Sequence, residues 1–293
     1  MKEKNSVPVS VVIVHYKTLE FTQKALHALY DSTVIPAQVI VVDNNSHDGL
    51  VESVKKDFPQ VEIIVNTENI GFAKANNQAM RNVVKQPFIW LLNSDTETGT
   101  DSLAQLYMYI EAHPRVAAVG PQLVYPTGEF QSVGGYFPSV SNIFSYFLPV
   151  GAIFPKKMRF RVKSIALYPQ TLSVDAKNLD YVTGAACLLR KEAVDQVGML
   201  AEEYFMYFEE TDLCFRFKRA GWEVCVINTD PVMHVYGGSF KTKYDSRRLK
   251  LFIESLEMFV TKNYTGLKKW IMIFEIKMLG SLSMVLKRLK SVL

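Results

Sequence analysis

The order of apolar runs along the chain constrains the fold more than any other feature. Short runs rich in β-branched or aromatic residues occupy positions 9–14, 39–42, 61–65 and 88–92. Between them, apolar residues recur every three or four positions, which is typical of helices. Continuous apolar runs of this length are typical of strands buried on both faces. The alternation therefore predicts βαβ units and an α/β fold around a largely parallel sheet flanked by helices.

The rest of the chain continues this pattern less regularly. Further strands are predicted at residues 116–119, 181–189 and 224–227, and helices from Asp101 and over about residues 210–220. Residues 126–178 show no period and contain a basic run at 156–163, so we expect a long loop or insertion there.

Composition excludes several classes of protein. The chain has 293 residues, of which 48% are hydrophobic, and this excludes a disordered or fibrous chain. A net charge of +4 is too small to indicate a nucleic-acid partner. Cys187, Cys214 and Cys225 lack metal-binding spacing and are interpreted as free thiols of a reducing compartment. Because neither a signal core nor a run of about 18 apolar residues is present, we expect a cytoplasmic protein.

The C-terminal segment is helical from Ser246 and basic. Residues 262–293 contain seven basic residues and one acid, and residues 268–293 carry an apolar stripe at helical spacing. Two interpretations stay open. The helix lies on a membrane surface, or it packs against its own domain or against a second subunit in a homodimer.

Polar residues follow the predicted strands at the point where each strand ends. They are His15, Asp43, Asn66, Asn93 and Asp95. The carboxyl ends of parallel strands form the usual ligand crevice of an open sheet. Neither a dinucleotide fingerprint nor a P-loop is present, and cations near the strand ends are few. Acids such as Asp95 therefore favour a nucleotide whose phosphates are bound through a divalent metal.

A second cluster of acids lies in an aromatic run. Glu209, Glu210 and Asp212 interrupt residues 204–215, where desolvation would raise a carboxyl pKa and favour a general base. The alternative is structural, because Asp212 is one turn before Arg216 and can pair with it. His234 is either a core residue or a metal ligand, and an imidazole ligand would favour Mn²⁺ over Mg²⁺.

Seven segments, taken in order, carry a resemblance to a known family. They are VSVVIVHYK, VIVVDNNSHDG, NTENIGFAKANNQAM, WLLNSDTE, VTGAACLLRKEAVDQVGML, EEYFMYFEETDLCFRFKRAGW and PVMHVYGGS. They are spread over residues 9–239, and the chain resembles family 2 inverting glycosyltransferases of the GT-A fold, in the rhamnosyltransferase-like branch. The resemblance implies a GT-A domain over residues 1–240, with a nucleotide-binding half over about 1–100 and an acceptor and catalytic half over about 101–240. An amphipathic helical extension follows over 241–293.

The resemblance also implies roles for individual residues. Asp43 matches the acid that binds the pyrimidine base, and Asp95 matches the last acid of the metal-binding DxD motif, in which Asn93 replaces the first acid. Glu210 matches the catalytic base, where the family usually has Asp, and Asp212 is the reserve candidate. His234 matches a histidine that completes the metal site. The expected nucleotide-sugar site further includes His15, Asn69, Gly71, Phe72, Asn77 and Gly184.

The expected function is transfer of a sugar, with inversion, from dTDP-L-rhamnose or a UDP-sugar to a hydroxyl group. The expected acceptor is a lipid-linked surface polysaccharide of cell-wall biosynthesis, reached at the inner face of the cell membrane. Mn²⁺ or Mg²⁺ would be the cofactor. A sugar-phosphate nucleotidyltransferase is disfavoured because its Gly-rich N-terminal loop is missing. A non-catalytic nucleotide or glycan binder stays open because Asn93 and Glu210 replace commoner acids.

Overall fold

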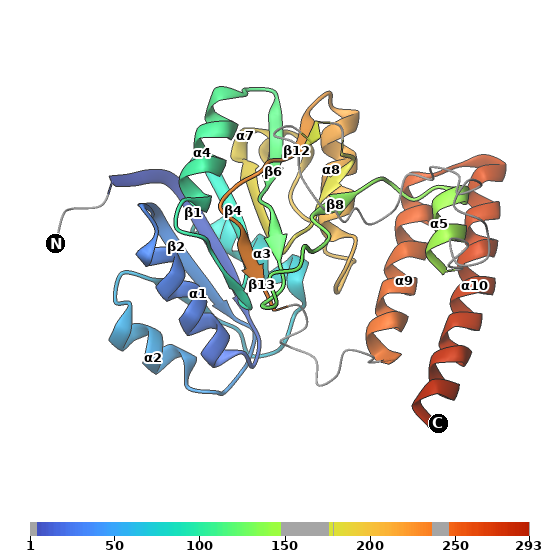
Figure 1. Ribbon diagram of the computed structural model, residues 1–293, viewed down its shortest axis with the longest axis horizontal. Helices are drawn as coiled ribbons and strands as arrows, with labels where there is room; N and C mark the ends of the chain where they lie inside the picture. Colours follow the sequence, from blue (N-terminus) through green and yellow to red (C-terminus); the bar gives the residue numbers. More distant parts are fainter. Residues whose placement is uncertain (1–4, 148–175, 178, 236–245, 293) are drawn as a thin grey trace.

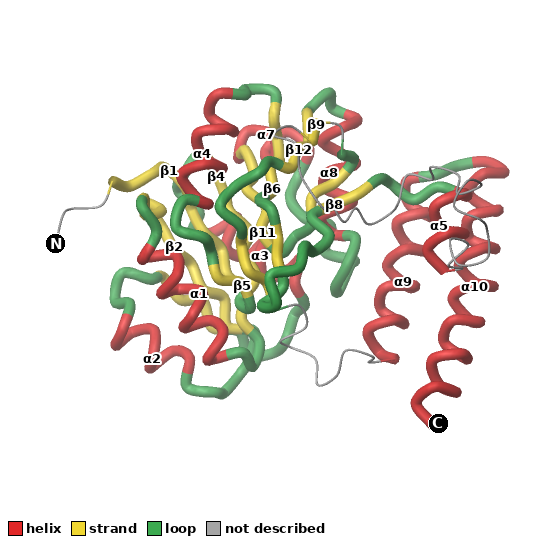
Figure 2. Tube along the Cα trace, in the orientation of Figure 1, coloured by secondary structure: helices red, strands yellow, loops and turns green. Residues whose placement is uncertain are grey.

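The computed structural model describes residues 5–147, 176–177, 179–235 and 246–292 (Figures 1 and 2). Its strands are β1 (Asn5–His15), β2 (Val34–Asp43), β3 (Glu62–Val65), β4 (Phe88–Asn93), β5 (Thr96–Glu97), β6 (Val116–Gly120), β7 (Leu123–Val124), β8 (Gly134–Gly135), β9 (Ala176–Lys177), β10 (Tyr181–Val182), β11 (Ala186–Arg190), β12 (Glu223–Val226) and β13 (Val232–His234). Its helices are α1 (Leu19–Asp31), α2 (Leu50–Asp57), α3 (Phe72–Asn82), α4 (Ser102–Ala112), α5 (Val140–Phe147), α7 (Lys191–Val197), α8 (Glu209–Arg219), α9 (Ser246–Asn263) and α10 (Gly266–Val292).

The centre of the molecule is a mixed sheet with the strand order β3-β2-β1-β4-β11-β6-β12-β9. The strands β1 to β4 pair in parallel, as the apolar runs predict. β11 lies between β4 and β6 and is antiparallel to both. In Figure 1, α1 and α4 lie in front of the sheet and α3 and α7 lie behind it. The α/β sheet flanked by helices is therefore confirmed.

The register of the first strands brings their carboxyl ends to one edge of the sheet. His15 pairs with Asp43 of β2, and Val14 pairs with Asn93 of β4. The strands are held in place by burial, since Val11, Ile13 and Trp90 are inaccessible to solvent. The polar residues that follow each strand are consequently neighbours in space, although they are up to about 80 residues apart in the sequence.

One expectation about the middle of the chain was wrong. Residues 181–189 do not form one strand, because β10 pairs with β8 whereas β11 joins the central sheet. Within the expected loop or insertion at 126–178, the described part contains the helix α5 and the two-residue strands β8 and β9. The basic run at residues 156–163 lies outside the described residues.

The C-terminal helices α9 and α10 lie side by side with α5, to one side of the sheet (Figure 1). They enclose a second apolar core, which includes Phe259, Met272 and Ile276. Tyr204 and Phe208, which precede α8, belong to the same core. No helix in the described ranges is both long enough and apolar enough to cross a membrane.

Candidate active site

A hollow lies at the carboxyl ends of β1, β2 and β4. Five residues expected in the nucleotide-sugar site line it, and they are Asn69, Gly71, Phe72, Asn93 and Asp95. The remaining lining residues are Val14, Tyr16, Asn44, Ser94, Phe205 and Met206. The hollow therefore combines residues at or after the ends of β1, β2, β3 and β4 with a loop that immediately precedes α8.

One wall of the hollow depends on a glycine. Gly71 has φ +87°, and a Cβ atom added there would lie 3.0 Å from the carbonyl oxygen of Phe205. Asn69 fixes this turn, because its Oδ1 accepts hydrogen bonds from the Gly71 N–H (3.0 Å) and from Nδ2 of Asn44 (3.2 Å). The N–H of Phe72 then donates to the same Phe205 carbonyl at 3.1 Å. The first residue of α3 is thereby joined to the loop before α8.

His15 and Asp43 lie beneath the hollow and are not among its lining residues. His15 is inaccessible, with Nδ1 2.7 Å from Oγ1 of Thr22 and Nε2 3.0 Å from Oδ2 of Asp48. Burial lowers the pKa of His15, against the opposing effect of the Asp48 carboxylate. Oδ1 of Asp43 accepts a hydrogen bond from the N–H of Ser46 at 3.0 Å. Both side chains hold the turn after β2, which contributes Asn44 to the hollow.

Asp95 and His234 come together at the edge of the hollow, with Oδ1 of Asp95 3.3 Å from Nε2 of His234. Gln131 determines the orientation of the imidazole. Its Nε2 amino group donates to the carbonyl oxygens of His234 and Val124, so its Oε1, 2.9 Å from Nδ1 of His234, accepts the Nδ1–H. Nε2 is then the ring nitrogen that faces the Asp95 carboxylate.

This pair of residues fits a divalent cation. Carboxylate oxygens and imidazole nitrogens are donor types that Mn²⁺ accepts, and Oδ1 of Asp95 lies 3.3 Å from Nε2 of His234. A hydrogen bond from the other ring nitrogen, such as the one to Gln131 here, is the usual support for a metal-binding histidine. Asn93 is adjacent, with Nδ2 3.5 Å from Nε2 of His234. No group of three or more His, Cys, Asp or Glu side chains in the described ranges could hold a metal ion. Oxygen atoms of a bound diphosphate would therefore have to supply further ligands.

Glu210 is the half-buried second residue of α8. A Cβ atom added to Gly184 would lie 3.7 Å from Cβ of Glu210 and 3.6 Å from the ring of Phe72. Gly184 thus separates Glu210 from a residue that lines the hollow. Burial raises the pKa of Glu210, and it raises the pKa of the adjacent Glu209 well above the ordinary value, with a further contribution from the repulsion between the two carboxyl groups. A raised pKa is what a general base at neutral pH requires.

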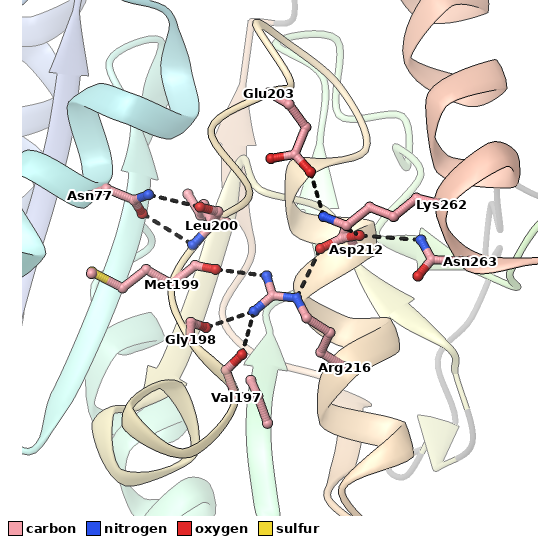
Figure 3. A network of polar contacts seen from close by, with 10 residues as sticks. All are labelled: Asn77, Val197, Gly198, Met199, Leu200, Glu203, Asp212, Arg216, Lys262 and Asn263. Carbon is pink, nitrogen blue, oxygen red and sulfur yellow. Dashed lines mark hydrogen bonds and ion pairs between the residues drawn. The ribbon is translucent and has the colours of Figure 1, made fainter.

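The structure does not support Asp212 as a base. Its side chain is inaccessible, and it accepts hydrogen bonds from Nε of Arg216 (2.9 Å) and Nδ2 of Asn263 (3.2 Å), while Nζ of Lys262 lies 3.3 Å away (Figure 3). A carboxylate enclosed by two cations and an amide has no access to a substrate hydroxyl. The expected alternative, pairing with Arg216, is what the structure shows.

Asn77 also lies away from the lining of the hollow. Its Nδ2 donates to the carbonyl of Leu200 (2.7 Å), and its Oδ1 accepts the N–H of Leu200 (3.1 Å) (Figure 3). Nδ2 also donates to Oε1 of Glu202 (2.9 Å). Asn77 therefore attaches α3 to the segment between α7 and α8. It shapes the site indirectly and does not face a nucleotide in this geometry.

The sequence interpretation missed Gln131, Phe205 and Met206. Gln131 falls in the irregular segment after β7, where no periodicity marks it, and only its proximity to His234 reveals its contribution. Phe205 and Met206 were noted only as part of an aromatic run. Their position could have been anticipated from the EETD motif, because the residues before a helix that bears the base must approach the substrate site.

Comparison with known proteins is consistent with this geometry. The model of the family described as "Glycosyl transferase family 2" matches residues 10–198. An N-acetylglucosaminyl-diphospho-decaprenol L-rhamnosyltransferase of Mycobacterium tuberculosis is 26% identical over 234 residues, which cover 76% of this chain and 75% of the relative. A low-salt glycan biosynthesis hexosyltransferase of Haloferax volcanii, Agl10, is 25% identical over 217 residues, with 72% and 62% covered.

Two solved structures share the fold. A mannosyltransferase of Pyrobaculum calidifontis, solved with GDP-Man and Mn²⁺, has a TM-score of 0.59 at 14% identity and covers 99% of this chain and 76% of its own. GalNAc-T7, solved with UDP, GalNAc and Mn²⁺, has a TM-score of 0.60 at 15% identity, with 87% and 48% covered. The likeness confirms the expected GT-A architecture.

Proposed function

Because the chain belongs to glycosyl transferase family 2, it is a glycosyltransferase that uses a nucleotide-sugar donor, and we propose that it transfers the sugar with inversion and with Glu210 as the base. One observation carries this proposal. Asp95 lines the hollow with His234 beside it, and Gly184 lies close both to Glu210 and to Phe72, which lines the same hollow. A nucleotidyltransferase or a non-catalytic binder is not favoured.

The proposed mechanism divides the work between two groups of residues. Asn44, Asn69 and Tyr16 line the hollow that would hold the nucleotide, and Phe72 would exclude water beside the sugar. The Glu210 carboxylate would take the proton of the acceptor hydroxyl as that oxygen attacks the anomeric carbon, opposite the departing diphosphate. Asp95 and His234 would hold a divalent cation, Mn²⁺ or Mg²⁺, which neutralises the negative charge that develops on the diphosphate.

For the substrates, we propose dTDP-L-rhamnose or a UDP-sugar as donor and a lipid-linked glycan as acceptor. The name of the mycobacterial relative, an L-rhamnosyltransferase that acts on a decaprenol-linked sugar, supports both. A contact to N3 of the base would distinguish poorly between the donors, because thymine and uracil offer the same N3–H donor. A thermal-shift panel of nucleotide-sugars with and without Mn²⁺ would identify the donor, since a ligand of the native state raises its apparent stability.

The first test is Glu210→Gln. The amide cannot accept the hydroxyl proton, so we expect turnover to fall by about 10²- to 10⁴-fold, while the affinity for the donor stays within about twofold. Glycosyl transfer and donor binding should be measured on the same preparation. Lys191→Gln is the control, because it removes an exposed ion pair with Asp195 in α7. Turnover of Glu210→Gln close to that of the wild type would refute Glu210 as the base.

We also propose that α10 contacts an anionic membrane surface. Its buried side, with Met272 and Ile276, packs in the second core, yet large apolar side chains stand exposed on the helix. These are Leu267 (76% exposed), Trp270 (65%), Ile271 (40%), Phe274 (65%), Met278 (49%) and Leu282 (46%). Lys268, Lys269 and Lys277 flank them in the sequence. An apolar stripe bordered by cations is typical of a helix that lies in the interface of an anionic bilayer.

A further inference from the structure

The segment Glu203–Phe208, which we term the catalytic loop, joins the hollow to the helix that bears Glu210. Phe205 and Met206 line the hollow, and Glu209 follows immediately as the first residue of α8. Tyr207 and Phe208 both have positive φ angles, +69° and +68°. Non-glycine residues adopt this conformation at a cost and keep it only where their surroundings impose it. The position of Glu210 therefore depends on what holds the catalytic loop.

Much of what holds the catalytic loop comes from α9, far along the sequence. Oγ of Ser255 donates to the carbonyl of Met206 at 2.8 Å, and Nε of Arg248 donates to the hydroxyl of Tyr207 at 2.9 Å. The ring of Phe208 packs against Phe252 and Phe259, with centroids 5.4 and 5.6 Å apart. Three consecutive residues of the loop are thus fixed by one helix.

Lys262, in the last turn of α9, connects the start of the catalytic loop with the first turn of α8. Its Nζ lies 2.6 Å from Oε1 of Glu203 at the start of the loop and 3.3 Å from Oδ1 of Asp212 in α8 (Figure 3). Burial alone would raise the pKa of Glu203, but the hydrogen bond and charge of Lys262 lower it below the ordinary value. Asn263 donates to the same Oδ1 of Asp212. The first turn of α8 is therefore held from α9 as well as from Arg216.

We propose that α9 is a positioning element of the active site, in which Lys262 and Ser255 hold the catalytic loop and thereby Glu210. This inference rests on the proposed role of Glu210. The nucleotide side of the hollow comes from residues 14–95, so displacement of α9 would misplace the base and leave donor binding intact. The residues of α9 lie beyond the segment that matches the family model, residues 10–198. Helix α9 would then position the base without itself contacting the substrate.

The test compares Lys262→Met with Lys277→Met in the full chain. Lys277 pairs with Glu257 at 3.1 Å between the same two helices but does not touch the catalytic loop. We expect Lys262→Met to lower kcat about tenfold or more, because small displacements of a reacting group are costly, with donor affinity within about twofold. Amide hydrogen exchange of residues 203–208 should accelerate about tenfold or more. Lys277→Met should leave all three quantities unchanged.

Two further variants separate positioning from a general loss of folding. Ser255→Ala removes one hydrogen bond to the loop and should shift kcat and loop exchange in the same direction. Lys262→Arg keeps a cation near Glu203 and Asp212. This variant should retain most of the wild-type kcat and most of the wild-type protection of the catalytic loop from amide exchange. Unchanged loop exchange in Lys262→Met, or equal effects of Lys262→Met and Lys277→Met, would overturn the inference. If the wild-type chain transfers no sugar, the proposed function fails, whereas the exchange measurements still decide whether α9 holds the loop.

Discussion

At the residue scale, the first turn of α8 contains two buried carboxyl groups with opposite surroundings. Asp212 is enclosed by Arg216, Lys262 and Asn263, which explains why a carboxylate can be inaccessible there. Glu209 is 5% exposed, and its Oε2 has no hydrogen-bond partner among the residues that the structure describes. Neutralising Glu209 therefore removes an unfavourable charge, whereas removing Asp212 would leave cations without their partner.

We predict that Glu209→Gln stabilises the protein at neutral pH. Burial and the neighbouring Glu210 raise the pKa of Glu209 well above 4.5. Between pH 4.5 and this raised pKa, the folded protein keeps the carboxyl proton, whereas the unfolded chain has lost it. The contribution of Glu209 to the free energy of unfolding is therefore greatest below about pH 4.5 and falls as the pH rises toward the folded-state pKa. The substitution should raise the free energy of unfolding by about 1–2 kcal/mol at pH 8 and by much less at pH 5.

Urea unfolding of both proteins at the two pH values measures this difference. Glu192→Gln, a change in the exposed first turn of α7, is the control and should shift stability equally at both pH values. A gain for Glu209→Gln that does not depend on pH would show that the charge of Glu209 is not the cause.

At the scale of elements, the critical junction is the one between the start of α3 and the catalytic loop. Gly71 combines φ +87° with ψ 171°, a region that only glycine occupies readily, and it also lacks space for a Cβ atom beside Phe205. Gly49, at the start of α2, has φ +86° and ψ 11°, with nothing within 4 Å of an added Cβ. An alanine at Gly49 would therefore introduce backbone strain alone, whereas an alanine at Gly71 would combine backbone strain with a steric clash.

We predict that Gly71→Ala lowers the free energy of unfolding by about 2–3 kcal/mol, and that Gly49→Ala lowers it by about 1 kcal/mol. Gly71→Ala should also weaken donor binding, because Gly71 itself lines the nucleotide side of the hollow between Asn69 and Phe72. Denaturant unfolding and calorimetric titration of the donor check both statements. Equal losses of stability in the two variants, with donor binding intact, would contradict the close approach at Gly71.

Elements formed from local sequence patterns were predicted, and those that depend on distant partners were not. The runs that became β1, β2 and β4 are largely buried, so their apolar residues are continuous and recognisable. Residues 181–189 form a similar run, but it divides at Gly184 because β10 pairs with Gly134–Gly135. Gln131 and Lys262 carry no local signal, since their importance comes from His234 and Asp212. The motif residues could be found in the sequence, whereas their supporting contacts could not.

At the scale of the whole molecule, two faces of α10 have different surroundings. The apolar residues predicted from the sequence period, such as Phe274 and Met278, are exposed, while Met272 and Ile276 form the packed side. Packing against the chain itself and contact with a membrane therefore concern different faces of the C-terminal helix. Packing against the chain itself is observed, and membrane binding through the exposed face stays a prediction.

We predict that the double variant Trp270→Ser/Phe274→Ser binds vesicles containing phosphatidylglycerol about tenfold or more weakly than the wild type, because two large apolar side chains are lost from the interface. Met108→Ser is the control, since Met108 is 66% exposed on α4, away from α10. Raising the salt concentration should also weaken wild-type binding. Undiminished co-sedimentation of the double variant would refute the proposal, as would a wild-type dimer that the double variant dissociates in light scattering.

The antiparallel strand β11 has a consequence for synthesis of the chain on the ribosome. β1 pairs with one edge of β4, but the partner of the other edge is β11, which is synthesised about 100 residues later. At about 5–20 residues per second, that edge stays open for on the order of ten seconds. The nascent chain up to Asn93 can assemble β1 to β4 by local pairing, yet it presents an apolar strand with unpaired backbone groups throughout this interval. The chain is therefore most open to pairing with other strands during its translation, before Arg190 has emerged.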